Sequence, residues 1–185
     1  CIDWAAKLTG TDGPAAFLAL AETAGVANGP ELFLPYLSGE RTPHNDPHIR
    51  GALLGLGNET GPAQIAASVL EGVAFAHADG LDALREAGTH VEELRVIGGG
   101  ARSQHWGQIL AAVLNVRLVY LEGGEVGPAL GAAKLAQIGV TGASPAEICT
   151  MPPISHSIEP DRVLTERLAP KLAQFRAAYP ALKTV

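Results

Sequence analysis

The chain has 185 residues, of which 47% are hydrophobic, and a formal net charge of −6. This length fits one domain spanning residues 1–185, and the hydrophobic content argues against a disordered chain. The negative charge and the lack of any lysine or arginine cluster argue against nucleic acid or an anionic membrane surface as a partner.

Helix and strand patterns alternate along the chain. Helical apolar spacing and helix-start residues predict helices, and short aliphatic runs predict strands. We expect helices at residues 3–8, 14–24, 60–87, 104–114, 126–137 and 160–178, and strands at residues 51–56, 93–97, 116–121 and 154–158. Thr11 or Asp12 is expected to cap the second helix, and residues 30–47 are expected to form an ordered loop. This alternation is typical of an α/β layer fold.

The cysteine and hydropathy patterns favour a location in the reducing cytoplasm. Cys1 and Cys149 form no disulfide framework. No apolar run approaches the length of a membrane span, and no signal peptide is visible. The chain begins with Cys1 instead of methionine, and the residues after it already have helical character. We therefore expect a piece of a longer protein, with ordinary processing or tag removal as the alternative.

The stretch at residues 97–103 (IGGGARS) lies between the predicted strand at 93–97 and the predicted helix at 104–114. A strand that enters a helix through three glycines leaves backbone N–H groups accessible, because glycine permits close approach and the helix start is partly positive. The pattern predicts a site for an anion or a nucleotide. A tight turn without a ligand is the alternative.

A dinucleotide-binding unit is a second alternative for this stretch. Gly98, Gly100 and Ser103 stand where the NAD fingerprint has its three glycines, and Glu122 follows about 20 residues later at a strand end. Serine at the third position weakens this interpretation, because close packing of helix on strand favours glycine there.

Residues 38–51 hold the highest density of polar groups. Glu40, Arg41, Asp46 and Arg50 are expected to form an ion-pair network that holds the shape of the loop. His44 and His48, also in this loop, lack the third ligand that a zinc site needs.

Other titratable residues give weaker signals. Glu71 lies in the long predicted helix, and an exposed or locally paired side chain is the default expectation. His77, His90, His105 and His156 are isolated, and no Ser-His-Asp arrangement is suggested.

Four patterns give the chain a resemblance to a known family. Residues 51–56 (GALLGL), with Gln64-Ile65 and residues 68–71 (SVLE) at the spacing found here, resemble the second signature of the FGGY carbohydrate kinases. Residues 35–43 (PYLSGERTP), residues 98–103 with Trp106, and residues 127–133 (GPALGAA) are similar to the xylulokinase branch of that family. The resemblance covers at least residues 4–139.

The resemblance implies an actin-like, ribonuclease-H-like ATPase fold with two domains and an active site between them. The chain is similar to the C-terminal, nucleotide-side domain, without the β-hairpin that opens it in the family. The catalytic aspartate is expected upstream of Cys1, so no catalytic residue is assigned within the chain. The isolated chain is expected to be inactive.

The resemblance also implies the site residues. Gly99 and Gly100 match glycines that pass along the nucleotide, Gln104 matches a nucleotide-contacting position, and Ser103 is its neighbour. Asp3 stands where the glycerol-kinase branch has an adenine-side glutamine. The implied ligands are ATP or ADP and Mg²⁺, the latter held mainly by phosphates and by residues outside the chain.

The implied reaction is phosphoryl transfer from ATP to a ketopentose, D-xylulose above all. Kinases for glycerol, ribulose or gluconate stay open as alternatives, as does a non-catalytic nucleotide-binding module. The sugar is expected to contact mostly the N-terminal domain. A homodimer also stays open.

Overall fold

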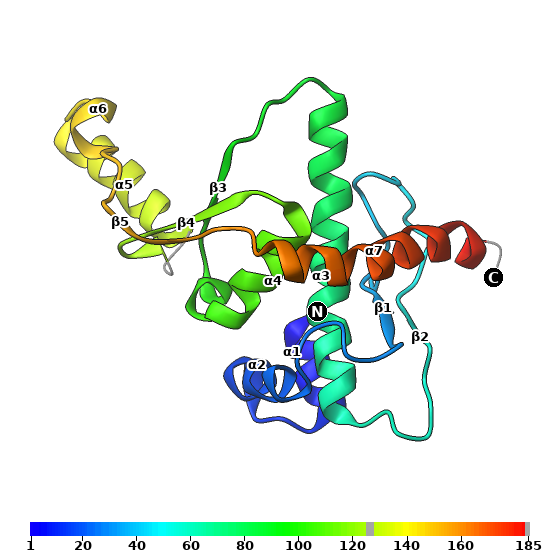
Figure 1. Ribbon diagram of the computed structural model, residues 1–185. Coiled ribbons are helices and arrows are strands. Elements are labelled where there is room, and N and C mark those ends of the chain that lie inside the picture. The colour runs from blue at the N-terminus through cyan, green and yellow to red at the C-terminus, as the bar shows by residue number, and fades with distance from the viewer. Residues whose placement is uncertain (125–127, 184–185) are drawn as a thin grey trace.

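The computed structural model describes residues 1–124 and 128–183, and helices and strands alternate along it (Figure 1). In chain order the elements are α1 (Ile2–Thr9), α2 (Gly13–Ala24), β1 (Leu32–Leu34), β2 (Ala52–Leu54), α3 (Pro62–Glu86), β3 (Glu93–Val96), the 3₁₀ helix η1 (Gly99–Arg102), α4 (Gln104–Leu114), β4 (Arg117–Leu121), α5 (Pro128–Thr141), α6 (Pro145–Ile148), β5 (Ile154–Ile158) and α7 (Arg162–Leu182). The predicted α/β fold class is confirmed.

A three-stranded sheet carries the candidate site, in the order β3-β4-β5. β3 and β4 run parallel, with Glu93 opposite Arg117 and Val96 opposite Tyr120. β5 pairs antiparallel with β4. α4 connects β3 to β4, because parallel neighbours need a crossover connection. The carboxyl ends of β3 and β4 therefore meet at one edge of the sheet.

A second, two-stranded sheet joins β1, which lies in the segment expected as an ordered loop, to β2, which lies in the strand predicted at 51–56. β1 pairs antiparallel with β2, with Leu32 opposite Leu54 and Leu34 opposite Ala52. The expectation of an ordered loop over residues 30–47 is wrong for β1, and the strand predicted at 51–56 is shorter than expected. The pairing joins residues about 20 positions apart, so local pattern alone did not reveal it.

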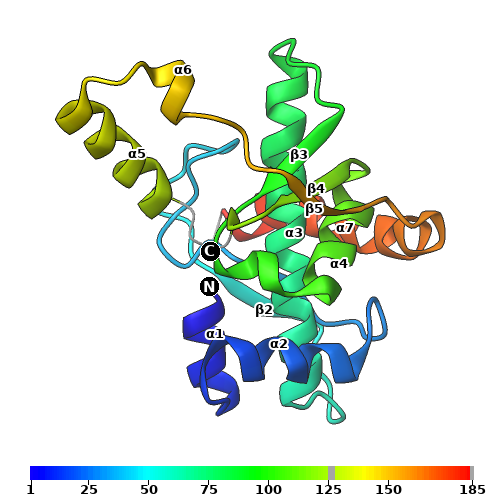
Figure 2. The ribbon, with the colours of Figure 1, turned by 90° about the vertical axis from the view of Figure 1, so that its left-hand side faces the viewer.

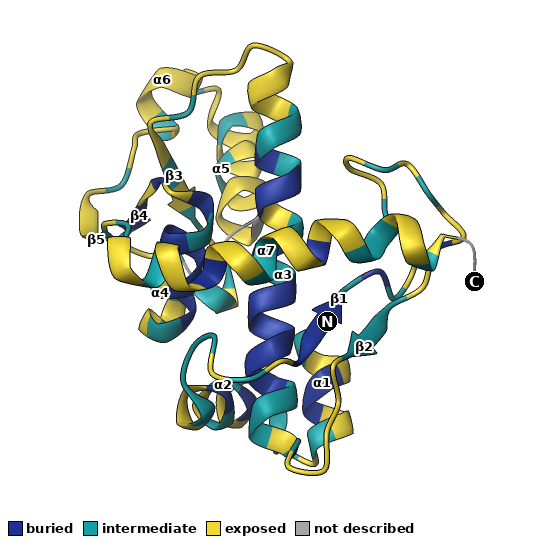
Figure 3. Ribbon diagram, turned by 45° about the vertical axis from the view of Figure 1, so that its right-hand side comes forward, coloured by how far each residue is buried: buried dark blue, intermediate teal, exposed yellow. Residues whose placement is uncertain are grey.

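The long helix α3 is the centre of the molecule and packs against α1, α2, α4, α7 and β1. Its middle turns are buried (Figure 3). Gly72 lies where β1 crosses the helix, and a Cβ on it would overlap the carbonyl oxygen of Phe33. Glycine here lets the backbone of a strand lie directly against the helix.

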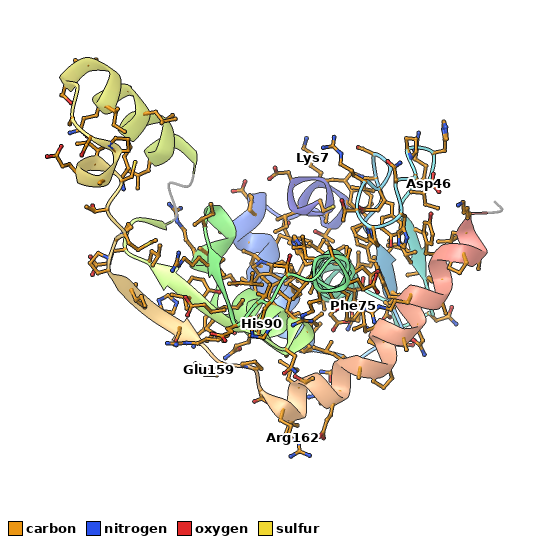
Figure 4. All side chains as sticks on the ribbon, turned by 90° about the horizontal axis from the view of Figure 1, so that it is seen from above. Lys7, Asp46, Phe75, His90, Glu159 and Arg162 are labelled. Carbon is orange, nitrogen blue, oxygen red and sulfur yellow. The ribbon has the colours of Figure 1, made fainter. Side chains whose placement is uncertain are left out.

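α7 crosses the surface of this body and covers the other side of α3. Its buried residues are Leu168 and Phe175, and the ring of Phe175 lies 5.6 Å from the ring of Phe75 on α3. Figure 4 shows Phe75 between these two helices. Asp161 caps α7, since its Oδ1 accepts the amide of Leu164 at 3.0 Å.

Glu71 on α3 corrects the sequence-based expectation of an exposed or locally paired side chain. It is 2% exposed, and its carboxylate accepts hydrogen bonds from the Ala27 amide and from Lys171 Nζ on α7. The two members of this ion pair stand 100 residues apart. The apolar neighbours of Glu71 along the helix gave no signal of a partner so far along the chain.

The loop at residues 38–50 also differs from expectation, because among the described ion pairs none joins two of its members. The Glu40 carboxylate accepts the Thr42 amide instead, Asp46 accepts the His48 and Ile49 amides, and Arg50 donates to three carbonyls of the same loop. Backbone bonds between Glu40 and Asp46 close the loop. Its side chains therefore shape it by satisfying backbone groups.

The structure differs from the sequence-based expectations at the N-cap of α2 and at the short helix α6. Asp12 holds the cap position of α2 without a side-chain hydrogen bond, and the Thr11 hydroxyl bonds to the Ala6 carbonyl. α6 was not predicted. Its signal was a capping box, in which the Ser144 hydroxyl and the Glu147 carboxylate bond each other's backbone amides.

α5 and α6 extend away from the rest of the molecule (Figure 2). α5 corresponds to the helix predicted at 126–137, of which Val126 lies outside the described residues, as does Gly127 of the motif at 127–133. Leu135 and Val140 on α5 are 69% and 87% exposed. Over the described residues we find no helix with the length and hydropathy to span a bilayer.

Candidate functional site

The connection from β3 to α4 forms a structured turn at the carboxyl edge of the sheet. Gly98 adopts φ 88°, a backbone conformation that favours glycine. Its amide donates to the Gly124 carbonyl at 3.0 Å, which ties this turn to the loop after β4. Gly124 was not predicted as part of this turn, although the Gly123-Gly124 pair after the predicted strand at 116–121 was an available signal.

Gly99 and Gly100 begin the 3₁₀ helix, and the first hydrogen bond of this turn runs from the Ala101 amide to the Gly98 carbonyl. The amides of Gly99 and Gly100 therefore precede the hydrogen-bonded part of the turn, as the first amides of a helix do. Gly99 is exposed, and a Cβ placed on it would meet no atom within 4 Å. Nothing in the described packing requires glycine at this position.

Gly100 is different, because it has a structural neighbour. A Cβ on it would lie 3.4 Å from Trp106 Nε1 and 3.5 Å from Trp106 Cδ1. Trp106 is 7% exposed and belongs to the main core. Gly100 is therefore partly explained by the indole beneath it, while Gly99 remains open to solvent.

Ser103 and Gln104 complete the turn. Ser103 is the N-cap of α4, and its hydroxyl oxygen accepts the Trp106 amide at 3.1 Å. That bond leaves the hydroxyl hydrogen available for donation to a ligand. Gln104 is the first residue of α4 and is exposed. The structure thus places Gly99, Gly100, Ser103 and Gln104 on one short segment.

Asp3 lies on a different element, in the first turn of α1, and is exposed. α1 packs on α2 and α3. The buried residues Ala5 and Ala6 of α1 belong to the core cluster against which Ala101 of the turn packs. Asp3 is thus fixed on the same body as the turn, but it is not part of the segment formed by the other four residues.

The electrostatic environment of the turn favours an anion. α4 has 11 residues, and its N-terminus lies beside the exposed side chain of Arg102. Aligned peptide dipoles make a helix N-terminus partly positive, and free amides add hydrogen-bond donors. A phosphate or a nucleotide is the kind of ligand that suits such a turn.

The polar loop at residues 38–51 is shaped largely by side-chain bonds to its own backbone. His44 stacks on Tyr179 with ring centroids 3.6 Å apart. Within residues 1–124 and 128–183, no group of three or more His, Cys, Asp or Glu side chains is arranged to hold a metal ion. The pKa of Asp46 is lowered: burial opposes ionisation, but the amides of His48 and Ile49 and the hydroxyl of Tyr179 outweigh it.

Comparison with known proteins assigns this arrangement to a family. The profile of the FGGY family of carbohydrate kinases, C-terminal domain, matches residues 4–140. The xylulose kinase of Escherichia coli K12 is 45% identical over 183 residues, which are 98% of this chain and 38% of that protein. The chain therefore spans well under half the length of this relative.

Solved structures agree in fold. A crystal structure described as a xyloylose kinase from Brucella ovis aligns with a TM-score of 0.83 and 42% identity, over 99% of this chain and 38% of that one. The gluconate kinase of Lactobacillus acidophilus aligns with a TM-score of 0.79 and 26% identity, over 98% and 37%. These similarities replace the dinucleotide-binding alternative. The chain belongs to the FGGY family of carbohydrate kinases and matches its C-terminal domain.

Proposed function

We propose that residues 1–185 form one domain, the nucleotide side of an ATP-dependent sugar kinase that converts D-xylulose to D-xylulose 5-phosphate in the cytoplasm. The family and the 45% identity to a xylulose kinase support the reaction class and the sugar. The geometry of the turn after β3 supports the placement of the nucleotide. Gly99, Gly100, Ser103, Gln104 and Asp3 are the proposed contacts.

The observation that carries the nucleotide site is the open position of Gly99. Glycine costs stability in a structured turn unless its conformation or a close contact requires it. Neither a left-handed φ nor a neighbouring atom within 4 Å is found at Gly99. A ligand lying flat against the backbone explains the missing side chain, because a Cβ would hold it away.

The proposed roles follow from the chemistry of phosphoryl transfer, in which positioning and charge stabilisation dominate. The amides of Gly99 and Gly100 and the start of α4 would hold the nucleotide. Ser103 would donate its hydroxyl hydrogen, and Gln104 its side-chain amide. The general base is assigned to an aspartate outside residues 1–185. Mg²⁺ would neutralise phosphate oxygens, and no described residue of this chain is assigned to it.

The choice of sugar is the less constrained part of the proposal. A gluconate kinase aligns almost as well in fold as the kinase from Brucella ovis. A glycerol kinase from Herminiimonas arsenicoxydans is 35% identical over 153 residues. The same domain fold therefore occurs in relatives that are named as kinases of different substrates. A non-catalytic nucleotide-binding module is the alternative from another class.

The activity test uses the product of the native gene. The purified protein is assayed with ATP and Mg²⁺ against D-xylulose, D-ribulose, glycerol and D-gluconate. We expect ADP release that depends on D-xylulose. Turnover of another member of the panel would correct the sugar, and no turnover of any member would overturn the kinase assignment.

The nucleotide test uses the 185-residue chain alone. We expect calorimetry to detect ADP binding to the chain and to detect a weaker interaction in the Gly99→Leu variant. If both proteins bind ADP equally, the nucleotide does not lie against Gly99. If the chain binds ADP but the native gene product is inactive with every sugar, the non-catalytic module is favoured.

A further inference from the structure

Trp106 lies beneath the glycine turn, as the third residue of α4. It is 7% exposed and belongs to the same core cluster as Ile109 and Leu110. The edge of the ring that carries the N–H faces the turn, because a Cβ on Gly100 would lie 3.4 Å from Nε1 and 3.5 Å from Cδ1. The apolar part of the indole therefore serves the core, while its polar atom lies at the candidate site.

The indole N–H of Trp106 has no acceptor within the described part of the chain. A buried tryptophan usually pairs its N–H, since an unpaired donor that is cut off from water costs free energy. Nε1 is not among the described side-chain atoms that are both sealed from solvent and unpaired. The N–H is therefore accessible beside Gly100, although little of the residue is exposed.

Backbone contacts fix the position of the indole relative to the turn. The Ser103 hydroxyl accepts the Trp106 amide at 3.1 Å, and the Ser103 amide donates to the Gly100 carbonyl at 3.2 Å. Gly100, Ser103 and Trp106 are thus one connected unit. The hydroxyl hydrogen of Ser103 and the indole hydrogen of Trp106 are two side-chain donors on the same turn.

Gly100 controls access to the indole N–H. Its backbone is not left-handed, so conformation alone does not call for glycine. A methyl group at this position would lie 3.4 Å from Nε1, where it would cover the donor. A ligand atom that accepts this hydrogen has to come within about 3 Å of the nitrogen. The absence of a side chain at Gly100 therefore leaves room for an acceptor.

We propose that Trp106 donates its indole hydrogen to the bound nucleotide, and that Gly100 is glycine so that the nucleotide can reach this donor. The inference rests on the proposed function and adds a side-chain contact to the proposed site. An indole N–H can donate but cannot accept. It therefore selects an acceptor atom of the ligand, which is a phosphate oxygen, a ribose oxygen or a ring nitrogen of the purine.

The main test removes the N–H and keeps the shape of the ring. Trp106 of the native gene product is replaced by benzothienylalanine, in which a sulfur atom stands in place of the N–H. We expect affinity for ADP, measured by calorimetry, to fall about tenfold, which corresponds to 1.4 kcal/mol. The thermal midpoint should not change, because no described residue bonds to the N–H.

The matched control makes the same replacement at Trp4, whose ring stacks on Phe33 of β1. This protein should bind ADP as the parent does. Normal ADP affinity of the protein altered at Trp106, or an equal loss in the control, would overturn the proposal.

A pair of substitutions tests the link between Gly100 and Trp106. Gly100→Ala should weaken ADP binding in the native product, because the methyl group covers the N–H. In the Trp106→Phe background the same substitution should have little effect, since no donor is left to cover. Equal losses in both backgrounds would show that the methyl group displaces the nucleotide directly, and would overturn the link.

Fragments of the nucleotide locate the acceptor. A loss of affinity for adenosine in the benzothienylalanine protein assigns the acceptor to the nucleoside, and a loss for pyrophosphate assigns it to the phosphates. Either result supports the proposal. If the parent binds ADP and the altered protein binds it equally well, the indole contact alone is wrong. If the parent binds no ADP, the proposed nucleotide site is wrong, and the indole contact with it.

Discussion

The loop at residues 38–50 is rich in charged side chains, whereas the turn at residues 98–104 begins with three glycines and offers mainly backbone groups. In the loop, Glu40, Asp46 and Arg50 bond to the backbone of the loop itself. In the turn, Gly99 and Gln104 face solvent. The charged side chains of the loop therefore shape the loop itself, while the missing side chain at Gly99 supports the proposed nucleotide site.

Ion pairs between α3 and α7, the helices beside the loop, also have a structural role. Arg176 on α7 bonds to Asp79 and Asp82 of α3 at 2.7 Å each, and Lys171 bonds to Glu71 one turn earlier on α7. These charged groups hold α7 against α3. Substitutions on this side are expected to change the free energy of unfolding, and substitutions in the turn are expected to change nucleotide affinity.

The largest effect on stability is expected for Glu71→Ala. The substitution leaves Lys171, whose side chain is 12% exposed, without its partner. Removing one member of a buried ion pair costs about 3–5 kcal/mol. Equilibrium unfolding in urea measures this loss. The double variant Glu71→Leu/Lys171→Met should recover much of it, because no buried charge then remains. If the double variant is less stable than Glu71→Ala, the pair is not the cause.

The second largest effect on stability is expected for Gly100→Val. This substitution tests packing and nucleotide binding at one position. The branched side chain would collide with Trp106, since a Cβ alone already lies 3.4 Å from the indole. Overpacking of this kind costs about 1–3 kcal/mol. We expect a lower free energy of unfolding together with weaker ADP binding. Unchanged stability would mean that Trp106 moves aside, and unchanged ADP binding would remove Gly100 from the site.

A smaller effect is expected for Asp46→Asn, at the junction of the loop with α7. The Asp46 carboxylate accepts two loop amides and the Tyr179 hydroxyl, and Figure 4 shows Asp46 in the loop near the end of α7. Its pKa in the folded protein lies below the ordinary 3.8. Stability from the carboxylate is therefore present above pH 3.8 and is lost as pH falls through the lowered pKa.

Thermal unfolding as a function of pH tests the role of Asp46. The variant should melt lower than the parent at pH 7, and the difference should shrink as pH falls below about 4. ADP binding should not change. A difference in melting that is independent of pH would assign the effect to packing instead of charge.

Local signals in the sequence were enough for some elements and not for others. The helix predicted at 104–114 has those bounds in the structure, because Ser103 caps it and its apolar face is regular. β1 and the burial of Glu71 were missed, since each depends on a partner far along the chain, β2 in one case and Lys171 in the other. Within the candidate site, the glycines could be found from the sequence. The difference between Gly99 and Gly100 could not, because it depends on the indole of Trp106.

The smallest effect on stability, and the most direct test of the comparison, is expected for Gly99→Ala. The added methyl group meets no atom within 4 Å, so the free energy of unfolding should change by less than about 0.5 kcal/mol, as for surface substitutions in general. If a nucleotide lies against this backbone, the same methyl group must displace it, and affinity for ADP should fall by about tenfold, which corresponds to 1.4 kcal/mol. Gln108→Ala, at an exposed position of α4 one turn beyond Gln104, is the control and should bind ADP normally. If the Gly99→Ala protein binds ADP with normal affinity, the nucleotide does not lie against Gly99, and the turn is not the nucleotide site.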